Sequence, residues 1–232
     1  MQGTATLLDV LANAQTDVRN IVLASSRSVY GEGAYLCTAC DPSGQRCYPG
    51  ARLSAQLAAH DWAPKCPDCG AAVVETATRE DDKLSPASIY AATKLAQEEM
   101  VRIAASSQGL AHAVLRFQNV YGEGQSLQNP YTGILSIFST RLRLGLSLPV
   151  FEDGEETRDF VHVEDVARAV LGFIEAPAEQ GALVNVGYGI PTSIMQVATL
   201  LAQFMDSDIV PHVSAQYRVG DIRHNHADLS AL

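Results

Sequence analysis

The chain has 232 residues, of which 47% are hydrophobic and 18% charged, and its formal net charge is −10 at pH 7. This is enough apolar material for the core of one domain or two small ones. The acidic balance argues against nucleic acid as a partner, because no basic stripe is present to face a phosphate backbone. Apolar runs such as Ile21 to Ala24 fall far short of the ~20 residues that span a membrane, and the N-terminus lacks a secretory signal, so we expect a cytoplasmic protein.

Strands and helices are expected to alternate along most of the chain. We predict, in order, a helix over 3–15, a strand over 20–25, a helix from Ser85-Pro86 to about 107, a strand over 112–117, helices over 133–144 and 163–175, a strand over 183–187, and a helix capped by Thr192 that ends near Met205. The strands are almost continuously apolar, which is typical of a parallel sheet with helices on both faces. The sequence therefore predicts an α/β fold.

All five cysteines lie in a segment rich in proline and glycine. Cys37/Cys40 and Cys66/Cys69 form two Cys-x-x-Cys pairs, a pattern that lets four thiolates converge on one tetrahedral ion. Zinc is the usual metal for four thiolates, and a closed shell of this kind indicates a structural role. We expect residues 34–79 to form a zinc-ribbon-like insertion. Free cysteines without metal are the alternative, and Cys47 is left over for packing or oxidation.

A tyrosine and a lysine four residues apart, Tyr90 and Lys94, fall on one face of an expected helix. An ammonium beside a tyrosine favours the phenolate, which is the basic form. Ser26 follows an apolar strand, at the position where open parallel sheets place their active sites. Judged by spacing alone, Tyr90 and Lys94 are more often an ordinary surface pair than a catalytic one.

Longer motifs give these residues a context. The sequence resembles the extended short-chain dehydrogenase/reductase family of nucleotide-sugar epimerases and dehydratases in five segments: Ser25-Ser-Arg-Ser-Val-Tyr-Gly31, Ser85-Pro-Ala-Ser-Ile-Tyr-Ala-Ala-Thr-Lys94, Leu115-Arg-Phe-Gln-Asn-Val-Tyr-Gly122, Thr157-Arg-Asp-Phe-Val-His-Val-Glu-Asp165 and Arg218-Val-Gly-Asp-Ile-Arg223. The segments follow one another in the family's order, which makes them jointly specific. The resemblance implies a Rossmann-like doubly wound parallel sheet.

The same resemblance implies roles for individual residues. Ser26, Tyr90 and Lys94 would form the catalytic triad and work with NAD. Cofactor contacts would come from Ser25, Tyr90, Lys94 and Phe117, and contacts with the nucleotide-sugar substrate from Asn119, Arg158, Arg218 and Arg223. Because family members are commonly dimers, a homodimer is a further expectation.

The two residues that directly follow the triad serine distinguish the dehydratases of the family from its other enzymes. Dehydratases of the family place Asp-Glu there, whereas this chain has Arg27 and Ser28, which cannot exchange a proton usefully at neutral pH. The resemblance therefore favours 4-epimerisation through a 4-keto sugar, with a dehydratase or reductase as an alternative. The four-cysteine insertion is similar to that of a bacterial group acting on dTDP-L-rhamnose, so we expect this or a related dTDP-hexose as substrate.

The family's glycine-rich turn, which holds the dinucleotide pyrophosphate at a helix N-terminus, has no match in the sequence. We therefore expect the chain to lack the first βα units of the cofactor domain. Residues 1–33 and 80–150 would form a partial Rossmann-like domain, and residues 151–232 would complete the sheet and part of the nucleotide-sugar site. A truncated or degenerate member that binds sugar nucleotides or a partner without turnover is the second hypothesis.

Overall fold

A three-stranded parallel sheet forms the centre of the larger part of the protein. The computed structural model describes residues 1–14, 16–127, 133–178 and 180–232. Strands β1 (Asn20–Ser26), β5 (Ala111–Phe117) and β9 (Ala182–Val186) are parallel and lie in the order β1-β5-β9. The register pairs Ser26 with Phe117, so both residues lie at the edge where the strands end.

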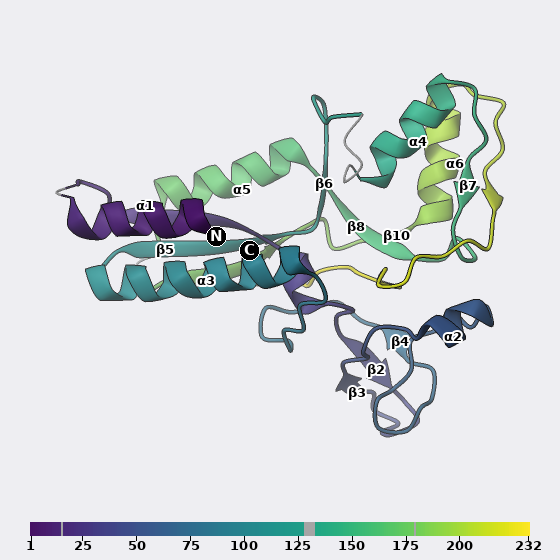
Figure 1. Cartoon of the computed structure of the whole chain (residues 1–232), viewed down its shortest axis with the longest axis horizontal. Helices are drawn as coiled ribbons and strands as arrows, with labels where there is room; N and C mark the ends of the chain where they lie inside the picture. Colours follow the sequence, from purple (N-terminus) through teal and green to yellow (C-terminus); the bar gives the residue numbers. More distant parts are fainter. Residues whose placement is uncertain (15, 128–132, 179) are drawn as a thin grey trace.

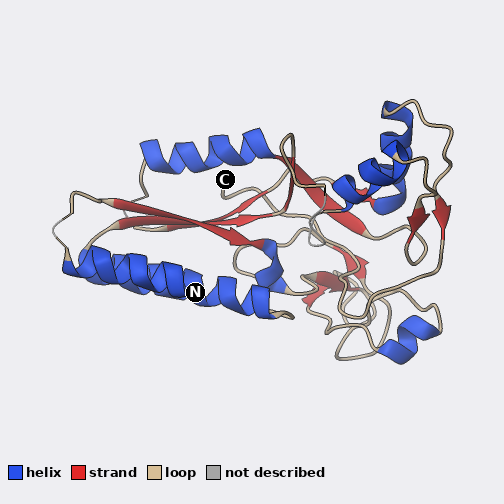
Figure 2. Cartoon of the chain, turned by 45° about the horizontal axis from the view of Figure 1, so that its top comes forward, coloured by secondary structure: helices blue, strands red, loops and turns tan. Residues whose placement is uncertain are grey.

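Helices cover both faces of this sheet. Helices α1 (Gln2–Asn13) and α3 (Ile89–Gln108) lie side by side on one face, and α5 (Val163–Glu175) lies on the other (Figures 1 and 2). Leu115 and Val184 of the sheet pack with Val166 of α5 in one buried cluster. The apolar character of these strands follows from burial on both faces, which confirms the predicted Rossmann-like α/β class.

A second, mixed sheet continues from the first. It contains β6 (Asn119–Tyr121), β8 (Thr157–His162) and β10 (Pro191–Ser193), with β8 in the middle, parallel to β6 and antiparallel to β10. Because β6 follows β5 after one residue, residues at the end of the first sheet face those of the second.

Beyond the second sheet, two helices pack against each other. They are α4 (Ile134–Arg143) and α6 (Ile194–Phe204), and beside them lies a pair of parallel strands, β7 (Pro149–Val150) and β11 (His212–Val213). The core of this region includes Phe138, Leu148 and Ala198. No helix within the described ranges is long and apolar enough to cross a membrane.

The cysteine-containing segment forms a small lobe next to the larger part (Figure 1). Its antiparallel sheet has the order β3-β2-β4, made of β2 (Tyr35–Cys37), β3 (Gln45–Cys47) and β4 (Val74–Glu75), and it also contains α2 (Ser54–Ala58). The short 3₁₀ helix η1 (Arg27–Tyr30) connects β1 to this lobe. Its buried cluster consists of Tyr35 and three cysteines, with Val73 packed against it.

The predicted start of the helix after Ser85-Pro86 is wrong by one turn. Helix α3 begins at Ile89, and its N-cap is Ser88, whose hydroxyl accepts a hydrogen bond from the amide of Ala91 at 3.1 Å. The amide of Ser85 instead donates to the carbonyl of Val29 at 2.9 Å. This long-range bond ties residue 85 to the end of η1, which sequence spacing does not reveal.

The predicted cap of the last helix is also wrong by one residue. Ser193, not Thr192, caps α6 in a capping box, in which its hydroxyl accepts from the amide of Gln196 and the side chain of Gln196 accepts from the amide of Ser193. Thr192 belongs to β10, where it pairs with Arg158 of β8. The pairing of β10 with β8 therefore decides where the helix begins.

Candidate functional site

A cleft of about 710 Å³ lies between the carboxyl ends of β1 and β5 and the second sheet. Seven of the residues predicted to form the site line it: Ser25, Ser26, Tyr90, Phe117, Asn119, Arg158 and Arg218. These residues come from five different segments of the chain. The fold therefore brings together residues that the sequence motifs only named one by one.

Ser26 and Tyr90 of the expected triad line this cleft, whereas Lys94 lies beside Tyr90 and is not among the lining residues. Ser26 ends β1, and its hydroxyl accepts a hydrogen bond from the amide of Ser28 at 3.2 Å. Tyr90 lies in the first turn of α3, with 57% of its surface exposed. One turn later, the ammonium of Lys94 is 5.8 Å from the centre of the Tyr90 ring and donates to the carbonyl of Ala24 at 2.8 Å.

The ammonium of Lys94 is partly buried. Burial lowers the pKa of its ammonium, and the nearby carboxylate of Glu98 opposes this shift. The carbonyl of Ala24 fixes the ammonium between β1 and the Tyr90 ring. This position places a positive charge beside the exposed ring of Tyr90.

Ser25 borders the cleft, but its hydroxyl is already engaged. It donates to the carboxylate of Glu98, which also forms an ion pair with Arg116 of β5. Arg116 in turn donates to the hydroxyl of Tyr30 at 2.8 Å. This buried network fixes α3 on the sheet, and a cofactor contact from Ser25 stays a prediction.

Three further donor groups that line the cleft suit a ligand rich in acceptor oxygens. Arg158 on β8 is partly buried, and burial lowers the pKa of its guanidinium, which donates to the backbone carbonyls of Thr157, Ile222 and Arg223. Arg218 is exposed, and its guanidinium lies 5.3 Å from the centre of the Phe151 ring. The amide nitrogen of Asn119 is buried and has no hydrogen-bond partner within the described ranges. An anionic diphosphate would satisfy such donors.

The structure does not place Arg223 in the cleft wall, in contrast to the sequence expectation. Its guanidinium is buried and donates to both carboxylate oxygens of Asp153 at 2.7 Å and to Glu152 at 2.9 Å. Three of its donor hydrogens are engaged by these carboxylates, and a substrate contact from Arg223 stays a prediction. Asp221, two residues earlier, lines the cleft instead.

Glu156 is a cleft residue that the sequence reasoning missed. It is only 7% exposed, and one of its carboxylate oxygens is buried without a hydrogen-bond partner in the described part of the chain. Burial, assisted by the negative charge of Glu152, raises the pKa of Glu156 to about 7. Glu156, Arg158 and Phe160 all line the cleft, as alternate residues of an extended segment do. The side-chain alternation of an extended segment, applied from Arg158 toward the N-terminus, could have identified Glu156 as a cleft residue.

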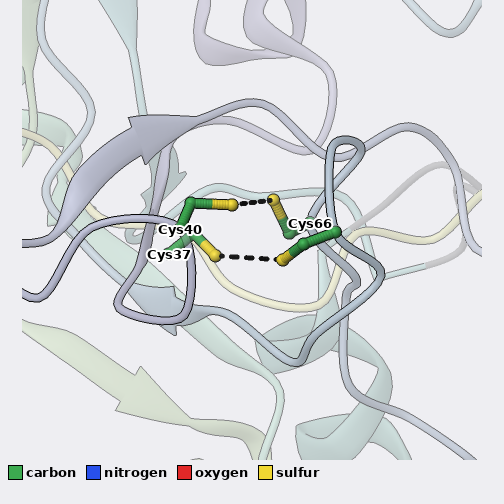
Figure 3. Close-up of side chains that lie close together, drawn as sticks. Cys37, Cys40 and Cys66 are labelled. Atoms are coloured by element: carbon green, nitrogen blue, oxygen red, sulfur yellow. Dashed lines mark hydrogen bonds between the residues drawn. The ribbon is translucent and has the colours of Figure 1, made fainter.

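The four cysteines of the two pairs come together in the small lobe. The sulfur atoms of Cys37 and Cys69 are 3.6 Å apart, those of Cys40 and Cys66 are 3.7 Å apart, and all four lie within 4.8 Å of one another (Figure 3). A tetrahedral ion with metal–sulfur bonds of about 2.3 Å requires sulfur–sulfur distances of about 3.8 Å. The donor set and its spacing therefore fit one zinc ion, while Cys47 packs in the core of the lobe.

Comparisons with known proteins identify a family for the chain. A family model described as "NAD dependent epimerase/dehydratase family" matches residues 62–187. A dTDP-L-rhamnose 4-epimerase of Burkholderia thailandensis is 39% identical over 228 residues, which are 98% of this chain and 60% of that protein. The chain thus spans about 60% of the length of this curated relative.

Two solved structures are similar over almost the whole chain. The UDP-N-acetylglucosamine 4-epimerase from Methanobrevibacter ruminantium, in complex with UDP-N-acetylmuramic acid, has a TM-score of 0.73 and 25% identity, covering 99% of this chain and 60% of that one. MoeE5, in complex with UDP-glucuronic acid and NAD, has a TM-score of 0.72 and 26% identity, covering 99% and 62%. From the motifs, the fold and these matches, we conclude that the chain belongs to the NAD-dependent epimerase/dehydratase family.

Proposed function

We propose that the chain carries the catalytic and substrate-binding part of an NAD-dependent nucleotide-sugar 4-epimerase. One observation carries this proposal: a single cleft is lined by Ser26 and Tyr90, beside which lies the ammonium of Lys94, and also by the cationic groups of Arg158 and Arg218. The first group suits proton exchange at a sugar hydroxyl, and the second suits a diphosphate. The relatives named as 4-epimerases support the same reading.

The residues present fit one half of the dinucleotide. Lys94 has further donors besides the one bound to Ala24, Tyr90 lies beside it, and Phe117 lines the same cleft as Tyr90, so these residues would hold the nicotinamide riboside. A glycine-rich turn for the pyrophosphate is not found in the sequence. The chemistry that NAD supplies when bound is reversible hydride exchange with a carbon of the sugar.

Tyr90, Lys94 and Ser26 would move and hold the proton of the C4 hydroxyl. Tyr90 accepts that proton as the general base, and the ammonium of Lys94 lies 5.8 Å from the centre of its ring. Ser26 donates a hydrogen bond to the reacting oxygen, which becomes a ketone. The keto sugar then rotates in the cleft so that its other face is presented to the triad. Tyr90 returns the proton to the same oxygen, so no net proton is consumed.

The diphosphate anchor makes this turning possible. Arg158 and Arg218 hold the diphosphate while the sugar presents its other face to the triad, and Asn119 supplies a further donor. Arg27, directly after Ser26, is buried and donates to the carbonyl of Gly31 at 2.8 Å. Although burial lowers the pKa of Arg27 to about 10, it stays protonated at neutral pH, so it is no base for a dehydratase.

For the substrate, we propose dTDP-L-rhamnose or a related dTDP-hexose. This rests on the 39% identical relative of that name and on the resemblance of the four-cysteine insertion. For the small lobe, we propose a structural zinc ion bound by Cys37, Cys40, Cys66 and Cys69, because their sulfur atoms already have nearly tetrahedral spacing.

The test is conversion of dTDP-L-rhamnose with added NAD, followed by chromatography of the epimeric products, together with NAD measured by absorbance after the purified chain is denatured. We expect turnover that falls by about 10²–10⁴-fold in Tyr90→Phe, since general base catalysis is lost. Tyr188→Phe is the matched control, because Tyr188 is 65% exposed and is not among the residues that line the cleft.

An unmodified chain that neither binds NAD nor converts the sugar would contradict the proposal. Titration with dTDP would then decide whether the chain is a nucleotide-sugar-binding module without turnover, which is the second candidate function. Binding of dTDP without NAD and without turnover would favour that candidate.

A further inference from the structure

The four-cysteine lobe has no role in the reaction proposed above, yet it contacts the wall of the cleft. Arg52 of this lobe is buried, and its two terminal nitrogens donate to the two carboxylate oxygens of Glu152 at 2.7 and 2.8 Å. One of them also donates to the backbone carbonyl of Asp221 at 3.0 Å. Because Asp221 lines the cleft, Arg52 is one residue away from the substrate site.

Glu152 connects this arginine to a whole segment of the wall. Its amide donates to the carbonyl of Gln216 at 2.7 Å, and its carboxylate also accepts from Arg223 at 2.9 Å. It is 2% exposed and has a φ of +48°, a conformation that residues other than glycine rarely adopt. The two buried arginines hold its side chain and thereby maintain this backbone geometry.

The lobe holds the same segment at two further points. The hydroxyl of Tyr35, in β2, accepts from the amide of His224 at 3.1 Å. The ring of Trp62 lies 6.1 Å from the ring of Tyr217, directly before Arg218. The lobe therefore contacts the segment from Tyr217 to His224 at both ends, and the cleft residues Arg218 and Asp221 lie between these two points.

We propose that Arg52 is a positioning residue for the nucleotide-sugar cleft, which fixes the segment 216–224 so that Arg218 faces the substrate diphosphate. This inference rests on the proposed function, because it needs a diphosphate in the cleft. The planar fork of an arginine makes two parallel bonds to a carboxylate and so defines an orientation, whereas a lysine makes a point contact. The four-cysteine lobe thus serves as a rigid part of the substrate site.

The test compares dTDP binding by calorimetry in the full chain and in Arg52→Lys. Lysine keeps a positive charge beside the buried carboxylate of Glu152, so the fold is retained while the two-point contact is lost. We expect the dissociation constant of dTDP to rise about tenfold, as loss of one charged hydrogen bond implies. Lys65→Met is the control: this lysine belongs to the same lobe and pairs with Asp61 at the surface, so binding should not change.

A double-mutant cycle separates positioning from general destabilisation. If Arg52 acts through Arg218, then Arg52→Lys should weaken dTDP binding in the original chain but add little in a chain that already carries Arg218→Met. A second variant, Tyr217→Leu, removes the ring contact with Trp62 without touching the buried ion pair and should weaken binding in the same direction.

Each outcome decides between two ideas. Unchanged dTDP binding in Arg52→Lys, or a loss that adds fully to that of Arg218→Met, overturns the positioning role and leaves the proposed function intact. A full chain that does not bind dTDP at all overturns both. Weaker binding that disappears on the Arg218→Met background supports the inference.

Discussion

Glu98 on α3 and Arg116 on β5 form a buried ion pair beneath the helix that carries Tyr90 and Lys94. Two nitrogens of Arg116 donate to the two carboxylate oxygens of Glu98 at 2.8 and 3.1 Å, and Ser25 donates to the same carboxylate. Glu98 lies one turn after Lys94 on α3. The pair therefore sets the position of the proposed base relative to the end of β1.

Glu98→Gln should lower the free energy of unfolding by about 3–5 kcal/mol, because it leaves the cation of Arg116 buried without its counter-charge. The new amide nitrogen is a donor and cannot accept from Arg116 or Ser25. Urea denaturation measures the effect. Glu99→Gln is the control, since Glu99 pairs with Arg102 on the exposed face of the same helix and should change stability by about 0–1 kcal/mol. Equal losses in the two variants would contradict the structural role of the buried pair.

Much of the fold could be predicted because burial leaves a pattern in the sequence. The run Ala113 to Leu115 is apolar because this part of β5 is buried, and the glycine at 109 ends α3 in a left-handed conformation, which suits a glycine. The partnership of Glu98 with Arg116 could not be predicted, because two charged residues 18 positions apart give no sign of burial. Only the packing of α3 on β5 brings them together.

The site residues were predicted from motifs, and a motif identifies a residue without showing which partners its side chain binds in the fold. Arg158 and Arg223 look equivalent in sequence. The structure separates them, because Arg158 lines the cleft, whereas Arg223 is not among the lining residues and pairs with Glu152 and Asp153. Glu156 was missed because no motif assigned it a role, although it lies two residues before Arg158.

The cap of α6 is testable by a pair of neighbouring substitutions. Ser193→Ala should lower the free energy of unfolding by about 1 kcal/mol, because one amide in the first turn loses its acceptor. Thr192→Ala should have a smaller effect, since Thr192 lies in β10 and outside the capping box. The spacing of Ser193 and Gln196 is the capping-box signature, so this signal was available in the sequence. A larger loss in Thr192→Ala would favour the original assignment.

The proposed zinc site predicts one zinc atom per chain by metal analysis. Cys66→Ala should abolish zinc binding and unfold the small lobe, because metal affinity and folding of such a lobe are coupled. Cys47→Ala should retain the metal, as Cys47 is not part of the four-sulfur group. Zinc that persists in Cys66→Ala, or is lost equally in both variants, would rule out the four-thiolate shell.

The raised pKa of Glu156 predicts a pH dependence of stability with a definite sign. The folded state holds the proton of this carboxyl up to a pH of about 7, whereas the unfolded state releases it near 4.5, so between these values the folded state binds more protons. The contribution of Glu156 to stability therefore decreases as pH rises through this window and is constant outside it. Glu156→Gln removes the titration, so its advantage over the original chain should grow from pH 4.5 to pH 7 and then level off. Urea denaturation at four pH values measures this, with exposed Glu155→Gln as the control. If the difference between Glu156→Gln and the original chain is the same at every pH, then Glu156 titrates like an exposed carboxyl and does not carry a buried proton beside Arg158.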